Sequence, residues 1–159
     1  MSGAGSITDY TLTEVAVGIK KKKFSSEEVT KECLNLVHQA QPKLNCFISI
    51  DAEAAIESAR KADRGLASGN KLGMLHGVPL AHKDMFYKKG LKSTGGSKIQ
   101  KDFIPSYTAT VISRLEAAGA ISLGGLNMSE FASGPVGQNL HFGDCKNPCL
   151  LYTSPSPRD

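Results

Sequence analysis

The spacing of apolar residues in the first third of the chain predicts two amphipathic helices. Each begins with a capping box, in which a hydroxyl residue stands three positions ahead of a glutamate: Thr11–Glu14 and Ser25–Glu28. Apolar residues at spacings of three and four then give each helix one buried face. They are Leu12, Val15, Ala16 and Ile19 in the first helix, and Val29, Cys33, Leu36 and Val37 in the second. We expect Pro42 to end the second helix, because proline cannot continue the hydrogen-bond ladder.

After these helices the pattern alternates between strand and helix. Residues 46–50, Cys-Phe-Ile-Ser-Ile, are apolar and rich in β-formers, which predicts a strand. Asp51 can then cap a third helix over residues 52–67. A second strand is predicted within residues 75–84, with Pro79 near its start, where a sheet tolerates proline.

The second half of the chain carries the strongest signal for an α/β fold. Residues 85–108 contain three glycines and a proline and are predicted to be mostly loop. An amphipathic helix follows over residues 109–118, and Gly119 suits the left-handed conformation that ends it. Residues 120–124 form a buried strand by composition, and Asn127 caps a short helix. This succession predicts an α/β unit with a parallel strand.

Composition and charge exclude few classes of function. The 159 residues, 40% of them hydrophobic and 21% charged, are typical of one globular domain with a sizeable core. The net charge of +4 is small. Part of it comes from Lys20–Lys23, a run without interleaved aromatic residues. A nucleic-acid patch is one interpretation, but a solvated helix end is favoured, because cations stabilise a helix C-terminus.

The sequence predicts a cytoplasmic protein with free thiols. No apolar window approaches the roughly 20 residues that span a bilayer, and residues 1–6 lack the charged and apolar regions of a signal peptide. The four cysteines are Cys33, Cys46, Cys145 and Cys149. A chain of this size does not need disulfides for stability, so we expect these thiols to be reduced.

The stretch Gly77–Asp84, Gly-Val-Pro-Leu-Ala-His-Lys-Asp, ends an apolar run with a lysine. In one interpretation Lys83 extends from the strand end into water beside Asp84, as most lysines do. In the other, a desolvated Lys83 loses its proton and serves as a base. Taken alone, the stretch favours the first interpretation, because lysine is seldom fully buried.

The sequence supports neither a phosphate-binding loop nor an assigned catalytic triad. Gly90–Ser97 nearly matches a phosphate-binding loop, but that loop needs lysine directly after its second glycine, where this chain has Gly96. A catalytic triad is recognised by geometry and not by content. His76, His82 and His141 are therefore left unassigned, and the candidate base has no unambiguous nucleophile.

A zinc site is also rejected. His141, Cys145 and Cys149 are spaced to line one face of a helix. Gly143 and Pro148 argue against a helix there, and a structural zinc site needs a fourth ligand that the sequence does not offer. We therefore predict no metal and no other cofactor.

Several motifs, in one order along the chain, resemble the amidase signature family. This is the family of bacterial amidases, fatty acid amide hydrolase and the A-subunit of the glutamyl-tRNA(Gln) amidotransferase. With the two leading helices, the resemblance covers roughly residues 7–148. The matching stretches are Gly77–Asp84 with Gly90 and Thr94, Asp102–Pro105, Thr108–Val111, Arg114–Ala120, Gly125–Phe131 and Asn139–Pro148.

The resemblance implies an α/β fold, with a mixed sheet flanked by helices, and hydrolysis of carboxamide C–N bonds. The family uses a serine nucleophile, a bridging serine after a cis peptide bond, and a lysine. Lys83 matches that lysine. In the family the neutral lysine takes a proton from the bridging serine. By position, Asn127, Met128 and Ser129 match the wall of the acyl pocket, and Glu130 is interpreted as a helix-capping residue.

The chain departs from the family pattern at its C-terminal end. Cys149 stands where the family has tryptophan, and neither serine block follows. Residues 1–148 are therefore interpreted as the N-terminal part of an amidase domain, and residues 149–159 as an unrelated, non-native tail. We expect this incomplete chain to be inactive alone, and we assign no catalytic role to its serines at positions 93, 97 and 133.

Two alternatives to a free-standing amidase stay open. One is the amidotransferase A-subunit, which hydrolyses glutamine to supply ammonia for a charged tRNA. The other is a non-catalytic binding or assembly module whose sheet a partner completes. The expected partners are a small-molecule amide and either a second copy of the chain or the other amidotransferase subunits. Neither a membrane nor direct contact with nucleic acid is expected.

Overall fold

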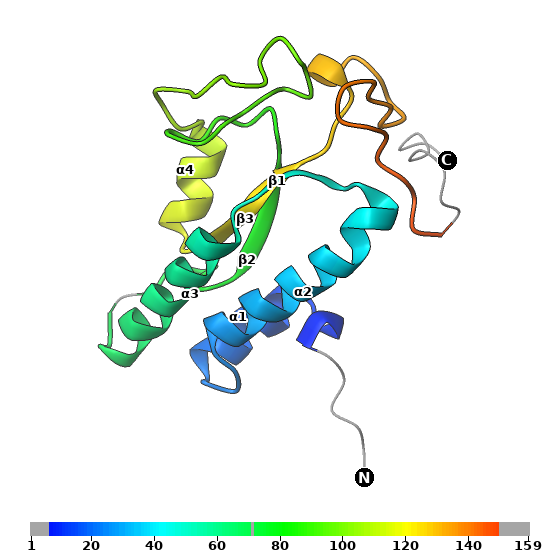
Figure 1. Cartoon of the computed structure of the whole chain (residues 1–159). Coiled ribbons are helices and arrows are strands. Elements are labelled where there is room, and N and C mark those ends of the chain that lie inside the picture. Colours follow the sequence, from blue (N-terminus) through cyan, green and yellow to red (C-terminus); the bar gives the residue numbers. More distant parts are fainter. Residues whose placement is uncertain (1–6, 71, 150–159) are drawn as a thin grey trace. The chain divides into compact units, whose positions relative to one another are not determined.

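The computed structural model describes residues 7–70 and 72–149, which form helices and a short sheet (Figure 1). In chain order the elements are η1 (Ile7–Asp9), α1 (Leu12–Lys20), α2 (Ser26–Leu44), β1 (Phe47–Ile50), α3 (Ala52–Ala67), β2 (Pro79–Lys83), α4 (Thr110–Ala117), β3 (Ile121–Leu126) and η2 (Glu130–Ala132). The chain divides into two compact units. Unit 1 comprises Met1–Leu36, Asp51–Leu80 and Arg114–Leu123, and unit 2 comprises Val37–Ile50, Ala81–Ser113 and Gly124–Asp159. The predicted tail lies outside the described residues apart from Cys149.

Both predicted capping boxes form. The Thr11 backbone N–H donates to Glu14 Oε2 at 2.8 Å, and the Glu14 N–H donates back to Thr11 Oγ1 at 3.3 Å. In the second box, Ser25 N–H donates to Glu28 Oε2 at 2.7 Å, and Glu28 N–H donates to Ser25 Oγ at 3.0 Å. Each box satisfies backbone donors that a helix start leaves without an intrahelical partner, and the predicted starts of α1 and α2 are confirmed.

The prediction that Pro42 ends the second helix is wrong. Helix α2 continues to Leu44 with Pro42 inside it. Proline removes only its own N–H from the ladder, and in the last turn few further bonds depend on it. The Asn45 N–H still donates to the Gln41 carbonyl oxygen at 2.9 Å, which closes the final turn.

The sheet is mixed, with strand order β1-β3-β2. Strand β1 pairs antiparallel with β3, in a register that sets Phe47 opposite Leu126 and Ile50 opposite Gly124. Strands β2 and β3 run parallel. Their starts are joined by a bond from Ile121 N–H to Val78 O at 2.9 Å, and their ends by one from Asp84 N–H to Leu126 O at 3.2 Å. The predicted fold class and the predicted parallel strand are therefore confirmed.

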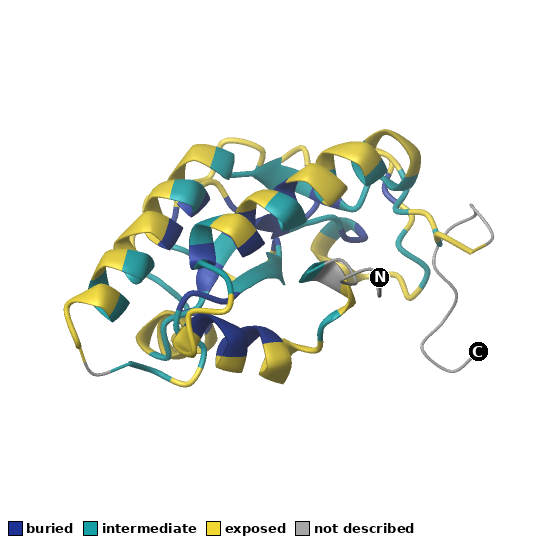
Figure 2. Cartoon of the chain, turned by 90° about the horizontal axis from the view of Figure 1, so that it is seen from below, coloured by how far each residue is buried: buried dark blue, intermediate teal, exposed yellow. Residues whose placement is uncertain are grey.

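One apolar cluster of buried residues lies in unit 1. The cluster consists of Val15, Ala16, Ile19, Val29 and Val78, and further buried apolar residues of unit 1 include Leu34, Ala55, Ala59, Ile121 and Leu123. In Figure 2 the buried residues of the helices lie on one side and the exposed residues on the other, as the helical spacing predicts. Gly119, with φ of +93°, ends α4 in the left-handed conformation as predicted. A Cβ at this position would lie 2.7 Å from the Cα of His76, so only glycine fits.

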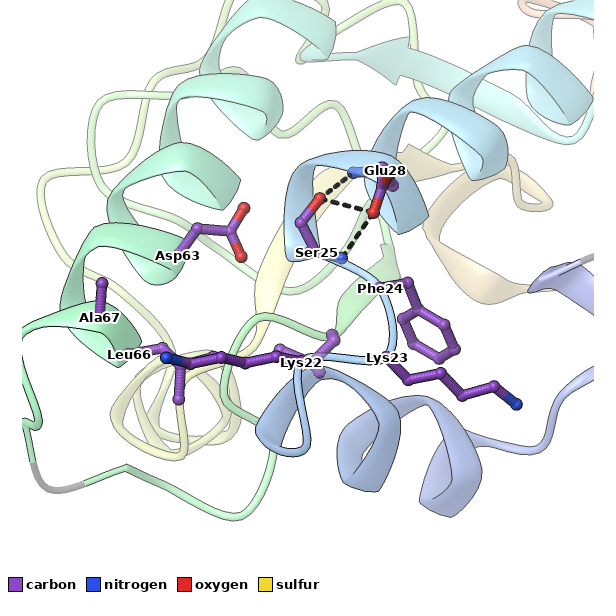
Figure 3. Close-up of a pocket in the computed structure, with 9 residues that line it drawn as sticks. Lys22, Lys23, Phe24, Ser25, Glu28, Asp63, Leu66 and Ala67 are labelled. Carbon is purple, nitrogen blue, oxygen red and sulfur yellow. Dashed lines mark hydrogen bonds between the residues drawn. The ribbon is translucent and has the colours of Figure 1, made fainter.

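The lysine run marks a helix end, as predicted. Helix α1 ends at Lys20, and all four lysines of Lys20–Lys23 are exposed. Two of them, Lys22 and Lys23, line a pocket of about 500 Å³ at the start of α2 (Figure 3). The N-terminus of α2 is already occupied by the Asp63 carboxylate, whose two oxygens accept the Ser26 and Glu27 N–H groups at 2.8 and 3.0 Å. No described helix is both long enough and apolar enough to cross a bilayer.

We expect Thr30→Val to stabilise the chain by about 1–2 kcal/mol, since an unpaired buried polar atom costs that much. Thr30 is fully buried in α2, and within the described ranges its Oγ1 has no hydrogen-bond partner. Valine keeps the branched shape and removes the hydroxyl. Urea unfolding followed by circular dichroism measures the change in unfolding free energy, with Thr30→Ser as the variant that keeps the hydroxyl. A valine variant no more stable than wild type would contradict the prediction.

Candidate active site

The candidate lysine lies at the C-terminal end of a parallel strand pair. Lys83 is the last residue of β2 and is half-buried. The bond from Asp84 N–H to Leu126 O brings the ends of β2 and β3 together, so Lys83 and the segment that begins at Asn127 leave the sheet at the same edge. In open α/β sheets this edge is where ligands bind.

Asp84 accepts hydrogen bonds from Ser93 and Thr94, in the loop that follows Lys83. Its side chain is buried, and its Oδ2 accepts the backbone N–H of Thr94 at 2.7 Å and the Thr94 hydroxyl at 2.5 Å. The Asp84 carbonyl oxygen accepts the Ser93 hydroxyl. Asp84 therefore fixes the backbone directly after Lys83. Throughout residues 7–70 and 72–149, no group makes a hydrogen bond or ion pair with the Lys83 ammonium.

Asn127 joins two segments and does not cap a helix. Its Nδ2 donates to the carbonyl oxygens of Asn45 and Gly143, both at 2.9 Å. Its Oδ1 accepts the N–H of Met128 at 2.8 Å. The short helical turn η2 starts later, with Ser129 as its N-cap, so the predicted cap at Asn127 is wrong. The Asn127 amide instead donates to carbonyl groups of residues that are distant in the chain. The local spacing of residues does not show that these bonds compete with helix capping.

The other two predicted pocket residues follow Asn127 directly. Met128 and Ser129 are buried, with exposed fractions of 2% and 6%. Ser129, Asn139 and Asp144 line a pocket of about 510 Å³ in unit 2. The structure thus brings the segment 127–129 to the same sheet edge as Lys83 and places one of its residues beside a cavity.

Glu130 pairs with distant side chains. The Ser97 hydroxyl donates to its Oε1 at 2.6 Å, and Nε2 of His141 lies 3.2 Å from the same oxygen. The interpretation of Glu130 as the cap of a helix begun by Asn127 is therefore wrong. The carboxylate instead connects the glycine-rich loop of residues 94–97 with the segment that carries His141.

Asn139 is a structural residue that the sequence did not single out. Its buried amide donates to the carbonyl oxygens of Gly96 and Met128, each at 2.7 Å. Its Oδ1 accepts the N–H groups of His141 and Phe142 at 2.8 and 2.9 Å. Gly96 has φ of +69°, and a Cβ there would lie 2.8 Å from the Met128 carbonyl oxygen. In the sequence, the Gly95-Gly96 pair was the one sign that another stretch of backbone, here that of Met128, packs directly against this loop.

The three serines left unassigned all donate to nearby oxygens. Ser93 donates to the Asp84 carbonyl, Ser97 to the Glu130 carboxylate, and Ser133 to the Glu130 carbonyl at 2.7 Å. Each hydroxyl proton is therefore engaged away from Lys83. Among the described residues, no group of three or more histidine, cysteine or acidic side chains is placed to hold a metal ion.

Comparison with known proteins identifies relatives along most of the chain. A family model described as Amidase matches residues 28–155. The glutamyl-tRNA(Gln) amidotransferase A-subunit of Pseudomonas aeruginosa is 46% identical over 145 residues, which cover 91% of this chain and 30% of that protein. The A-subunit of Azotobacter vinelandii is 47% identical over 138 residues, 87% of this chain and 28% of that protein. The chain thus spans about 30% of the length of these relatives.

Solved structures share the fold. A bacterial aryl acylamidase of the amidase signature enzymes family matches with a TM-score of 0.85 and 29% identity, over 89% of this chain and 30% of that chain. The peptide amidase of Stenotrophomonas maltophilia matches with a TM-score of 0.82 and 25% identity, over 90% of this chain and 31% of that chain. Both proteins are named as amide-hydrolysing enzymes.

Proposed function

This chain belongs to the amidase signature family, and from that premise we propose that it carries the lysine base and part of the acyl pocket of an enzyme that hydrolyses carboxamides. The observation that carries the proposal is the position of Lys83. It ends β2 beside the end of β3, where the segment 127–129 leaves the sheet. A base and a substrate wall at one strand edge are what the chemistry requires.

In this mechanism Lys83 acts in its neutral form. Its amine takes the proton of a bridging serine, that serine takes the proton of the nucleophilic serine, and the nucleophile attacks the amide carbon to form an acyl-enzyme. Water then releases the acid. Asp84, fixed by Thr94, holds the backbone from which Lys83 extends. The two serines are proposed to lie in residues of the gene product that this chain does not include.

The segment 127–129 is proposed to form one wall of the acyl pocket. The Asn127 side chain bonds to the backbone of Asn45 and Gly143, so its contribution is to fix the wall. Ser129 lines the neighbouring cavity and can contact a substrate. We propose a cytoplasmic enzyme that needs no cofactor and acts on a small amide without direct contact with nucleic acid.

A second candidate is the amidotransferase A-subunit, because the curated relatives carry that name at 46–47% identity. In that case the amide is glutamine, and the released ammonia passes to a charged tRNA through partner subunits. The lysine chemistry is the same in both candidates. They differ in substrate and in assembly, and those two properties decide between them.

The test is to extend the genomic reading frame, express the full-length gene product, and assay it against simple amides and glutamine. We expect two glycine- and serine-rich blocks after Pro148, and amide hydrolysis by the full-length product but not by the 159-residue chain. Glutaminase activity with co-purifying subunits would select the amidotransferase. A reading frame without those blocks would refute the enzyme proposal and leave a non-catalytic module. Lysine-dependent turnover by the 159-residue chain would refute the claim that the serines lie elsewhere.

A further inference from the structure

Two segments of unit 2 that are distant in sequence lie side by side. The Lys146 N–H donates to the Leu44 carbonyl oxygen at 2.8 Å. The Asn45 side chain donates to the carbonyl oxygen of Phe142, also at 2.8 Å. In Figure 1 the red end of the described chain passes the turn between α2 and β1, where residues 44–46 lie. These bonds hold residues 142–146 against that turn.

Each of these segments carries one cysteine. Cys46 comes directly after Asn45, and Cys145 directly before Lys146, so each cysteine is next in the chain to a residue whose bond joins the segments. Both cysteines are half-buried and reduced. Burial raises the pKa of each thiol, and the negative charge of a Cys46 thiolate further raises the pKa of Cys145.

We propose that Cys46 and Cys145 form a reversible disulfide when the chain meets an oxidised low-molecular-weight disulfide such as glutathione disulfide. One protein thiolate attacks the glutathione disulfide, and a mixed disulfide forms with release of one glutathione thiolate. The second protein thiolate then attacks the mixed disulfide and releases the other. Two protein thiols are oxidised, and one glutathione disulfide is reduced to two glutathione molecules.

This cross-link has a structural consequence next to the candidate site. The amide of Asn127 bonds to Asn45, the residue before Cys46, and to Gly143, two residues before Cys145. A disulfide would join the two segments covalently and fix both partners of Asn127. The modification site is independent of the proposed amidase activity, because neither sulfur takes part in that mechanism.

The test uses Cys33→Ser/Cys149→Ser in the full chain, which leaves Cys46 and Cys145 as its two thiols. The protein is incubated with glutathione disulfide at a mildly alkaline pH, because raised pKa values leave little thiolate at neutral pH. Intact mass and non-reducing peptide mapping follow the products. We expect loss of two hydrogen atoms in mass, a single Cys46–Cys145 cross-link, and full reversal by dithiothreitol.

A parallel reaction in urea tests whether the fold brings the thiols together. Closing a long flexible loop is entropically costly, so the ratio of cross-link to glutathione adduct should be about tenfold or more higher in native buffer than in urea. Cys33→Ser/Cys46→Ser/Cys149→Ser, with Cys145 alone, should give only a glutathione adduct. Adducts on both thiols without a cross-link, or an equal ratio in urea and buffer, would overturn the proposal.

Discussion

Replacing Lys83 with alanine in the full-length gene product is expected to lower kcat/KM for amide hydrolysis by about 10³-fold or more. The lysine is the only proton acceptor that the proposed mechanism assigns within this chain, so its loss leaves the bridging serine without a base. Lys83→Arg is the sharper variant. Arginine keeps the positive charge and much of the length, but its guanidinium does not deprotonate in proteins. We therefore expect arginine to be as inactive as alanine.

Lys89→Ala is the matched control for Lys83. Lys89 lies in the loop after β2 and is exposed. Its substitution should leave kcat/KM within about a factor of two, since surface substitutions change the free energy by about 0.5 kcal/mol or less. Thermal unfolding should show that Lys83→Ala stays folded. An arginine variant that keeps a third or more of the activity would show that charge, not proton transfer, is the contribution of Lys83.

Asp84→Ala is expected to destabilise the protein by about 3–5 kcal/mol, because it leaves the Thr94 N–H and hydroxyl buried without their acceptor. Both groups donate to Asp84 Oδ2, and the aspartate side chain is only 3% exposed. This is a large share of the 5–15 kcal/mol, roughly, that holds a domain folded. Equilibrium urea unfolding of the 159-residue chain measures it.

Two further variants separate the contributions of the two Thr94 bonds to the free energy of unfolding. Asp84→Asn keeps an acceptor oxygen and should cost roughly half as much as alanine. Thr94→Val removes the hydroxyl and keeps the N–H bond, so it should cost about 1–2 kcal/mol. If Asp84→Ala unfolded at the same urea concentration as Lys89→Ala, the bond to Thr94 would contribute nothing, and Asp84 could not be the residue that positions Lys83.

The sequence predicted the elements that local chemistry determines. Capping boxes at Thr11 and Ser25 marked the starts of α1 and α2, and Gly119 marked the end of α4, because those signals act within a few residues. The positions of Asn127 and Glu130 also looked like local caps. Their side chains instead bond to residues 82 and 33 positions away in the chain, and no local pattern encodes those partners.

In the candidate site, too, some features could be predicted from the sequence and others could not. Lys83 was conspicuous because an apolar run ended in a charge. Asp84 and Asn139 were not, since a polar residue in a loop gives no sign that it will be buried. Their burial depends on how the loops of unit 2 pack, with Gly96 letting the Met128 backbone approach. The chemistry of a site can thus be visible in sequence while the bonds that fix its geometry are not.

The strand order has a consequence for synthesis of the chain on the ribosome. Strand β3 lies in the middle of the sheet and is the last of the three strands to be made. Until residues 121–126 emerge, β1 and β2 lack the strand that pairs with each of them, whereas α1 and α2 are stabilised by local bonds as soon as they are complete. Nascent chains shorter than this should hold two unpaired strands, and the open edges of such strands are prone to association with other chains.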